Sequence, residues 1–96
     1  MKETIRELTP EYEKRQSYYG KALLKQKYNV LTLVSYDTEI IKINLSTYKL
    51  ETLCGPEDLS NTTLRHLREF LKQNELGHIA ELTKKEMIEN IFKKRG

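Results

Sequence analysis

Cys54 and His66 are the residues in this sequence that could form a nucleophile and its general base. The spacing along the chain fixes no acidic partner for either, and Cys54 lies near the end of a predicted strand. We therefore interpret Cys54 as a small buried thiol. His66, His78 and a single cysteine do not have the spacing of a zinc site. The adjacent Glu57 and Asp58 suit the start of a helix better than an acid–base pair. We expect no catalytic residue, no metal and no cofactor.

His66 is predicted to have a structural role. It lies on the flank of the apolar stripe of a predicted helix, one turn before Phe70. Its ring is expected to pack beside Phe70 and to form a hydrogen bond with the sheet or with the loop before the helix. A place in a binding interface is the alternative for His66.

Binding is the activity that the other polar and aromatic residues favour. Two groups of basic side chains occur on predicted helices, and the predicted sheet is rich in tyrosine, which is frequent at recognition surfaces. A solvated helix face is the alternative for the basic groups. The candidate binding residues are Arg65, Arg68, Lys72, Lys84, Lys85, Tyr19 and Tyr28, and a further basic run is Lys93, Lys94 and Arg95.

The clearest amphipathic element is the helix predicted over residues 59–73. Its apolar stripe is formed by Leu64, Leu67, Phe70 and Leu71. The opposite side is expected to carry Arg65, Glu69, Lys72 and Gln73. Ser60 or Asn61 is expected to cap the first turn, and Gly77 to take the left-handed conformation that ends the helix.

A second helix is predicted to begin at Thr83. Thr83 and Glu86 have the spacing of a capping box, in which each side chain accepts a hydrogen bond from the other residue's backbone N–H. Both are therefore predicted to be structural residues.

Residues 17–54 show the alternating pattern of four strands joined by short connections. Short connections make consecutive strands antiparallel, so a four-stranded β-meander is expected. With the helices following the strands, the predicted fold is α+β, with two C-terminal helices packed on one face of the sheet. The highly charged residues 1–16 are expected to form a separate short helix or arm, with helix near residues 10–17, and residues 17–96 to form the single domain.

The composition predicts a folded cytoplasmic protein. Hydrophobic residues make up 38% of the chain and charged residues 32%, which is typical of a folded domain. The net charge of +3 permits binding to nucleic acid or to an acidic protein without demanding it. A single cysteine fits a reducing cytosol, and neither a signal peptide nor a membrane-spanning run is visible.

Three runs of the sequence resemble a family of small proteins of unknown function from phages, plasmids and conjugative elements of Gram-positive bacteria. These runs are residues 17–22 (SYYGKA), 35–38 (SYDT) and 60–71, of which TTLRHLREFL is the most distinctive part. The resemblance extends over residues 17–92. No catalytic residues can be carried over from this resemblance, because the family has no agreed chemistry. It does imply a setting in a bacterial host cell, where accessory proteins of mobile elements often bind and block a host machine.

The expected function is that of a non-enzymatic accessory protein that binds and inhibits a host defence nuclease. Anti-CRISPR inhibitors of type II CRISPR effectors are one such group. The alternative is a small nucleic-acid-binding accessory protein of a phage or plasmid, whose binding through the basic residues would weaken steeply with salt. The expected partner is a host protein, with nucleic acid as the alternative, and no membrane contact is expected.

Overall fold

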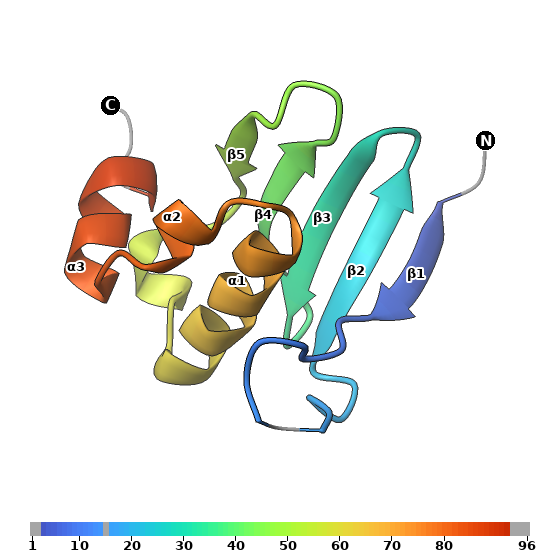
Figure 1. The fold of residues 1–96 in the computed structure, drawn as a ribbon, viewed down its shortest axis with the longest axis horizontal. Coiled ribbons are helices and arrows are strands. Elements are labelled where there is room, and N and C mark those ends of the chain that lie inside the picture. Colours follow the sequence, from blue (N-terminus) through green and yellow to red (C-terminus); the bar gives the residue numbers. More distant parts are fainter. Residues whose placement is uncertain (1–2, 15, 93–96) are drawn as a thin grey trace.

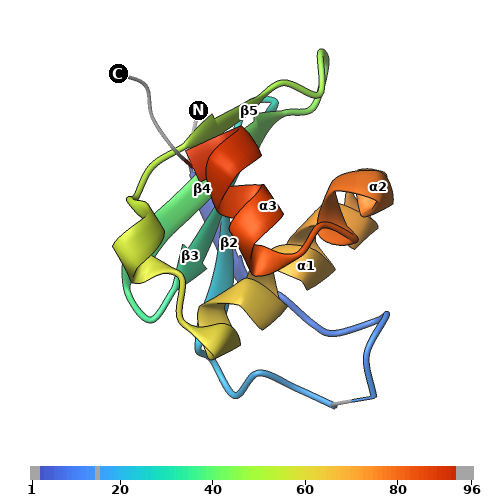
Figure 2. The same ribbon diagram turned by 90° about the vertical axis from the view of Figure 1, so that its left-hand side faces the viewer.

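The computed structural model describes residues 3–14 and 16–92. A five-stranded antiparallel sheet in the order β1-β2-β3-β4-β5 is covered on one face by helices (Figures 1 and 2). The strands are β1 (Thr4–Glu7), β2 (Ala22–Lys27), β3 (Val30–Ser35), β4 (Thr38–Asn44) and β5 (Leu50–Thr52). The helical elements are η1 (Pro56–Asp58), α1 (Asn61–Gln73), α2 (Gly77–Ala80), α3 (Lys84–Met87) and the π-helix η2 (Ile88–Phe92). The predicted α+β class and antiparallel meander are confirmed.

The strand β1 adds a fifth member to the four strands expected from the sequence. It pairs antiparallel with β2, with Ile5 opposite Lys25. All four residues of β1 are exposed, so this strand lacks the alternation of buried and exposed residues by which sequence patterns reveal strands. The helix expected near residues 10–17 does not form in the described residues of that segment. The N-terminal segment instead supplies one edge of the sheet.

The segment between β1 and β2 is held against α1 by Glu69. This carboxylate accepts hydrogen bonds from the backbone N–H groups of Glu11 at 2.7 Å and Tyr12 at 3.1 Å, and Gln73 Nε2 donates to the carbonyl of Thr9 at 2.7 Å. Glu69 is only 2% exposed, which corrects its predicted place on the solvent side of the helix. The amphipathic pattern misses this because the covering segment is far away in the sequence.

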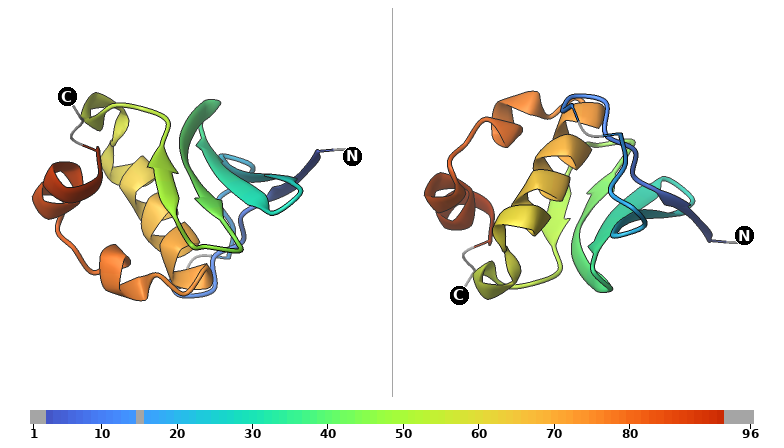
Figure 3. Two further views of the ribbon diagram at one scale, coloured as in Figure 1. Left: turned by 90° about the horizontal axis from the view of Figure 1, so that it is seen from above. Right: turned by 90° about the horizontal axis from the view of Figure 1, so that it is seen from below.

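The core lies between the sheet and the helices (Figure 3). Leu33 of β3 and Ile41 and Ile43 of β4 are fully buried beneath Leu67 and Phe70 of α1. Burial of each such side chain contributes about 1.5–3 kcal/mol to the free energy of folding. Ion pairs on the sheet join Lys25 of β2 to Glu39 of β4 at 2.7 Å and Lys42 of β4 to Glu51 of β5 at 3.5 Å. Within the described part of the chain, no helix has both the length and the apolar character needed to cross a membrane.

Both ends of α1 are defined by local hydrogen bonds. Ser60 is the N-cap, and its side chain accepts from the Thr63 backbone N–H at 3.1 Å. At the other end Glu75, not Gly77, takes the left-handed conformation, with a φ of 65°. The Leu76 N–H donates to the Leu71 carbonyl at 2.8 Å, as in a Schellman motif. Glu75 is therefore the residue that follows the C-cap Asn74 in the left-handed conformation, and Gly77 begins α2.

The last helical segment has the predicted start. Thr83 Oγ1 accepts from the Glu86 N–H at 3.1 Å, and the Glu86 carboxylate accepts from the Thr83 N–H at 2.9 Å, so the capping box is present. This helix is in two parts, α3 and then η2, which bury Met87 and Phe92 respectively. The basic run Lys93, Lys94 and Arg95 lies outside the described residues.

Substitution of Glu75 tests its left-handed backbone conformation. Replacing Glu75 with glycine should raise the free energy of unfolding by about 1 kcal/mol, because glycine adopts a positive φ without steric cost. Chemical denaturation of the purified chain measures the change. The matched control is Glu81→Gly, also at an exposed helix end but with a φ of −81°. There glycine should destabilise, and the same sign for both variants would contradict the assignment.

Candidate functional site

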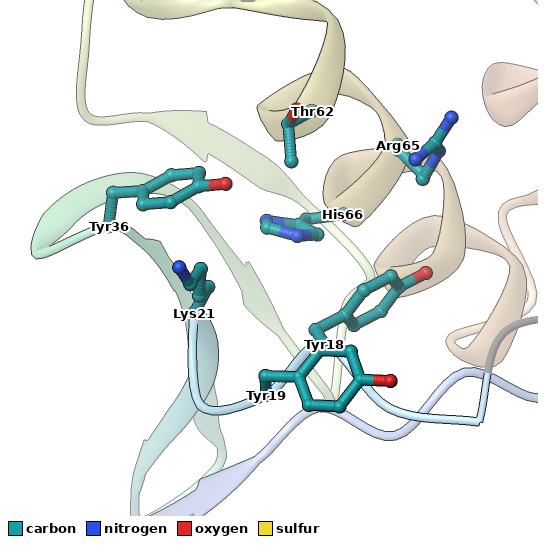
Figure 4. Close-up of a pocket in the computed structure, with 7 residues that line it drawn as sticks. All are labelled: Tyr18, Tyr19, Lys21, Tyr36, Thr62, Arg65 and His66. Atoms are coloured by element: carbon teal, nitrogen blue, oxygen red, sulfur yellow. The ribbon is translucent and has the colours of Figure 1, made fainter.

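One end of the sheet carries a pocket of about 270 Å³. It lies where the segment before β2 and the β3–β4 turn meet the first turns of α1 (Figure 4). The lining residues are Tyr18, Tyr19, Lys21, Tyr36, Thr62, Arg65 and His66. The pocket therefore combines three tyrosine rings with two cationic side chains and a histidine.

His66 lies at the base of the pocket and is only 1% exposed. Its Nδ1 is 2.9 Å from Ser35 Oγ at the end of β3, and the same Oγ is 2.9 Å from Thr63 Oγ1. The imidazole contacts the edge of the Tyr18 ring at a centroid distance of 4.5 Å and lies 5.9 Å from the Tyr36 ring. Figure 4 shows these two rings on either side of the imidazole. The hydrogen bonds thus join α1 to the sheet beneath the pocket.

Tyr18 forms a rigid wall of the pocket. Its ring is buried, and its hydroxyl donates a hydrogen bond to the Glu13 carboxylate. Burial raises the pKa of Tyr18, and the hydrogen bond to Glu13 raises it further. The hydroxyl therefore stays protonated and keeps donating at physiological pH. Glu13 also lies 3.6 Å from Arg65 Nε, which places a cation at this side of the pocket.

Lys21 is the second cation of the pocket. Its Nζ is 5.7 Å from the centroid of the Tyr36 ring, within the range of a cation–π contact. Among the described residues, no carboxylate lies within ion-pair distance of Lys21. The positive charge of Lys21 is consequently uncompensated by a direct partner in the described chain.

Four exposed tyrosines, two of them at the pocket, have a positive φ. Tyr19 and Tyr36 are 76% and 48% exposed, with φ values of 55° and 51°. Tyr28 and Tyr48 are 63% and 46% exposed, with φ values of 56° and 61°. Such values are uncommon for bulky residues, which clash with the backbone there. Tyr36 occurs in a two-residue hairpin turn with Asp37, whose φ is also positive, as a type I′ turn requires.

The two pairs of tyrosines lie at opposite ends of the sheet. Tyr19 and Tyr36 flank the start of β2 and the end of β3, whereas Tyr28 and Tyr48 lie in the β2–β3 and β4–β5 turns. Those two turns are neighbours, since Leu45 N–H donates to the Asn29 carbonyl at 2.7 Å. The sequence-based selection of Tyr19 and Tyr28 therefore took one residue from each end and missed Tyr36.

A model of a protein family matches residues 6–90, a range that includes every residue of the pocket. The chain belongs to DUF8033. This is a family of unknown function. No curated protein and no solved structure matches the chain. Family membership therefore assigns no activity, and the pocket must be interpreted from its own geometry.

The basic residues selected from the sequence do not form one surface in this DUF8033 chain. Arg65 lines the pocket together with Tyr19. Lys72 lies in the last turn of α1, and Lys84 and Lys85 are exposed in the first turn of α3. The structure thus brings only two of the seven candidate residues together, at the pocket.

Arg68 has an internal role that differs from the expected surface position. Its Nη1 donates hydrogen bonds to the backbone carbonyls of Ala80 and Leu82, the latter at 2.7 Å. The guanidinium therefore connects α1 to the segment between α2 and α3. The last carbonyls of a helix have no N–H donor within the helix, and one arginine can donate hydrogen bonds to two of them at once.

Cys54 does not line the pocket that contains His66. Burial, followed by the nearby charges of Asp58 and Glu57, raises the pKa of the Cys54 thiol to about 11. The thiol is therefore protonated at neutral pH and is a weak nucleophile. In the described ranges, no three His, Cys, Asp or Glu side chains are grouped so that they could hold a metal ion.

Substitution of His66 tests its structural role. His66→Ala should lower the free energy of unfolding by about 1–3 kcal/mol, because it removes a buried hydrogen bond and the contacts with two rings. The melting temperature should fall by several degrees. His78→Ala, at an exposed histidine, is the matched control and should leave melting unchanged. An unshifted His66→Ala melt would favour a role confined to binding.

The raised pKa of Cys54 predicts slow alkylation. The pKa moves from 9.0 to about 11, so at pH 8 the thiolate fraction in the folded chain is about 100-fold lower than at an ordinary cysteine. The rate of iodoacetamide labelling, followed by mass spectrometry, should increase steadily as the pH is raised toward 11. Labelling in guanidinium chloride provides the unfolded reference. Equal rates for the folded and unfolded chain at pH 8 would show that the thiol is unprotected.

Proposed function

We propose that this protein is a non-enzymatic accessory protein of a mobile genetic element, which binds and inhibits a host defence nuclease in the bacterial cytoplasm. The mode of action is that of an anti-CRISPR inhibitor of a type II CRISPR effector, which occupies a functional surface of the nuclease without turnover. The mobile-element setting comes from the resemblance in residues 17–22, 35–38 and 60–71. The binding role is supported by the geometry of the surface.

The observation that carries the binding role is the group of exposed tyrosines with positive φ. A left-handed conformation costs a residue with a side chain about 1–2 kcal/mol, and glycine or asparagine would be the less strained choice. Between 46% and 76% of each of these side chains is exposed, so much of the ring surface is not packed within the chain. Tyrosine is, however, among the residues that contribute most to protein–protein affinity. Backbone strain at a defined surface position is a feature of functional sites.

The side chains that resemble catalytic groups support binding rather than turnover. Ser35 and His66 are within hydrogen-bond distance, as in a nucleophile and base, but Ser35 is buried and also bonds to Thr63. A substrate therefore has no access to Ser35 Oγ. The Cys54 thiol is protonated at neutral pH, which disfavours nucleophilic catalysis.

The positions of the basic residues favour a protein partner over a nucleic acid. Nucleic-acid binding without sequence preference requires several cations along one groove, each placed near a phosphate. Here Arg68 is engaged with backbone carbonyls, and Arg65 lies at the pocket. Lys84 and Lys85 belong to a different helix from either of them. Among the described residues, these cations therefore come from separate helices, and Arg68 is already occupied by backbone acceptors.

Nuclease inhibition provides the test. The purified chain, added in increasing molar ratio to a type II CRISPR nuclease loaded with guide RNA, should reduce cleavage of a target DNA to zero at a fixed stoichiometry. Several such nucleases should be compared, because inhibitors of this kind discriminate among effectors by surface contacts. Full cleavage by all of them at excess inhibitor would count against the proposal.

Paired tyrosine variants identify the surface that binds. Tyr19→Asn with Tyr36→Asn should abolish inhibition while preserving the fold, since asparagine accepts a positive φ more readily than tyrosine. Tyr28→Asn with Tyr48→Asn makes the same change at the opposite end of the sheet and is the matched control. Melting temperatures of both double variants should equal or exceed that of the parent. If inhibition is lost only in the Tyr28→Asn, Tyr48→Asn variant, the interface lies at the end of the sheet opposite the pocket.

A further inference from the structure

We propose that the pocket at Lys21 and His66 receives an acidic side chain of the partner, whose carboxylate is bound by Lys21 with Arg65 at the rim. This inference rests on the proposed function, because it assumes that the occupant belongs to a protein. It adds the chemical class of the group that is recognised. The charges, the aromatic walls, and the size of the pocket each support it.

The charges of the pocket select an anion. Lys21 is exposed and has no carboxylate within ion-pair distance among the described residues. Arg65 is 3.6 Å from Glu13, and its side chain is 46% exposed, so it retains donors that can turn toward a ligand. Thr62 also lines the pocket. An aromatic cage for a cationic ligand is disfavoured, because Lys21 already lies over the Tyr36 ring.

The aromatic walls strengthen binding of a buried charge. Tyr18, Tyr19 and Tyr36 exclude water around the cations once a partner covers the pocket, and a lower local dielectric strengthens the attraction between opposite charges. The ring of Tyr36 also limits the motion of Lys21, which lowers the entropy lost on binding. Side chains that flank the acidic residue of the partner can pack on Tyr19, the most exposed of the tyrosines.

The size and surroundings of the pocket favour one carboxylate over a polyphosphate chain. Its volume of about 270 Å³ is at the lower limit of small-molecule sites, which begin near 300 Å³. It therefore accommodates one or two side chains. Two carboxylates lie beside the pocket, since Asp37 follows Tyr36 in the same turn and Glu13 contacts Arg65 and Tyr18. These charges disfavour a chain of several phosphates more strongly than a single acidic group, which carries only one negative charge.

Titration of the ¹⁵N-labelled full chain with defined probes tests the inference. The probes are the peptide acetyl-Ala-Glu-Ala-amide, its glutamine counterpart acetyl-Ala-Gln-Ala-amide, and the oligonucleotide (dT)₁₀. Peptide concentrations of about 20 mM exceed the millimolar dissociation constants expected of one charged contact. The glutamate peptide should shift the backbone amides of Tyr19, Lys21, Tyr36 and Thr62, and the glutamine peptide should bind about tenfold more weakly.

Charge-removing variants supply the matched controls. Lys21→Gln should weaken binding of the glutamate peptide about tenfold. Lys27→Gln, at the exposed opposite end of β2, should leave it unchanged. Equal binding of the two peptides, shifts confined to other residues, or no shifts would overturn the inference. Tighter binding of (dT)₁₀ to the same amides would also overturn it and would identify a nucleic-acid contact.

The nuclease assay separates this inference from the proposed function. If the parent chain inhibits and Lys21→Gln inhibits equally well, the pocket is not the recognition site, although the proposed function stands. If the glutamate peptide binds at the pocket and the parent chain inhibits no nuclease, the proposed partner is wrong, although the recognition chemistry stands. Loss of inhibition in Lys21→Gln, but not in Lys27→Gln, supports both proposals.

Discussion

The hydrogen bonds that join His66, Ser35 and Thr63 are the constraint on which the candidate site depends. Apolar packing between a helix and a sheet tolerates small shifts of one layer over the other. Buried polar groups do not, because each must keep its partner. Ser35 is the last residue of β3 and is followed directly by Tyr36. The contact of 2.9 Å between Ser35 Oγ and His66 Nδ1 therefore also fixes the position of Tyr36 relative to α1. The second bond, to Thr63, ties the same serine to the first turn of the helix.

The helix α1 organises the other parts of the chain through polar contacts on two further sides. Glu69 holds the segment that follows β1, and Arg68 holds the segment between α2 and α3. Both residues are charged and both are removed from full solvent exposure, which is favourable only when backbone partners replace water. Two segments that are distant from α1 in the sequence are consequently attached to this one helix.

Local signals in the sequence predicted those features that depend on neighbouring residues. The Ser60 and Thr83 caps and the alternation of β2 to β5 are of this kind. Features created by distant segments were not predictable from such patterns. β1 has no buried face, and Glu69 is covered by residues nearly sixty positions earlier. The pocket combines three separate segments, so single-sequence spacing identified Tyr19 and Arg65 but not Lys21 or Tyr36. A two-residue connection between strands demands positive φ, and this signal could have drawn attention to Tyr36.

The contact between Glu69 and the segment after β1 has a consequence for the order in which the chain folds. Hairpins of neighbouring strands join residues close in sequence and can form as soon as they leave the ribosome. The carboxylate that secures Glu11 and Tyr12, by contrast, is synthesised 58 and 57 residues later. The contact of Glu11 and Tyr12 with α1 therefore forms only after the strands between them have been synthesised.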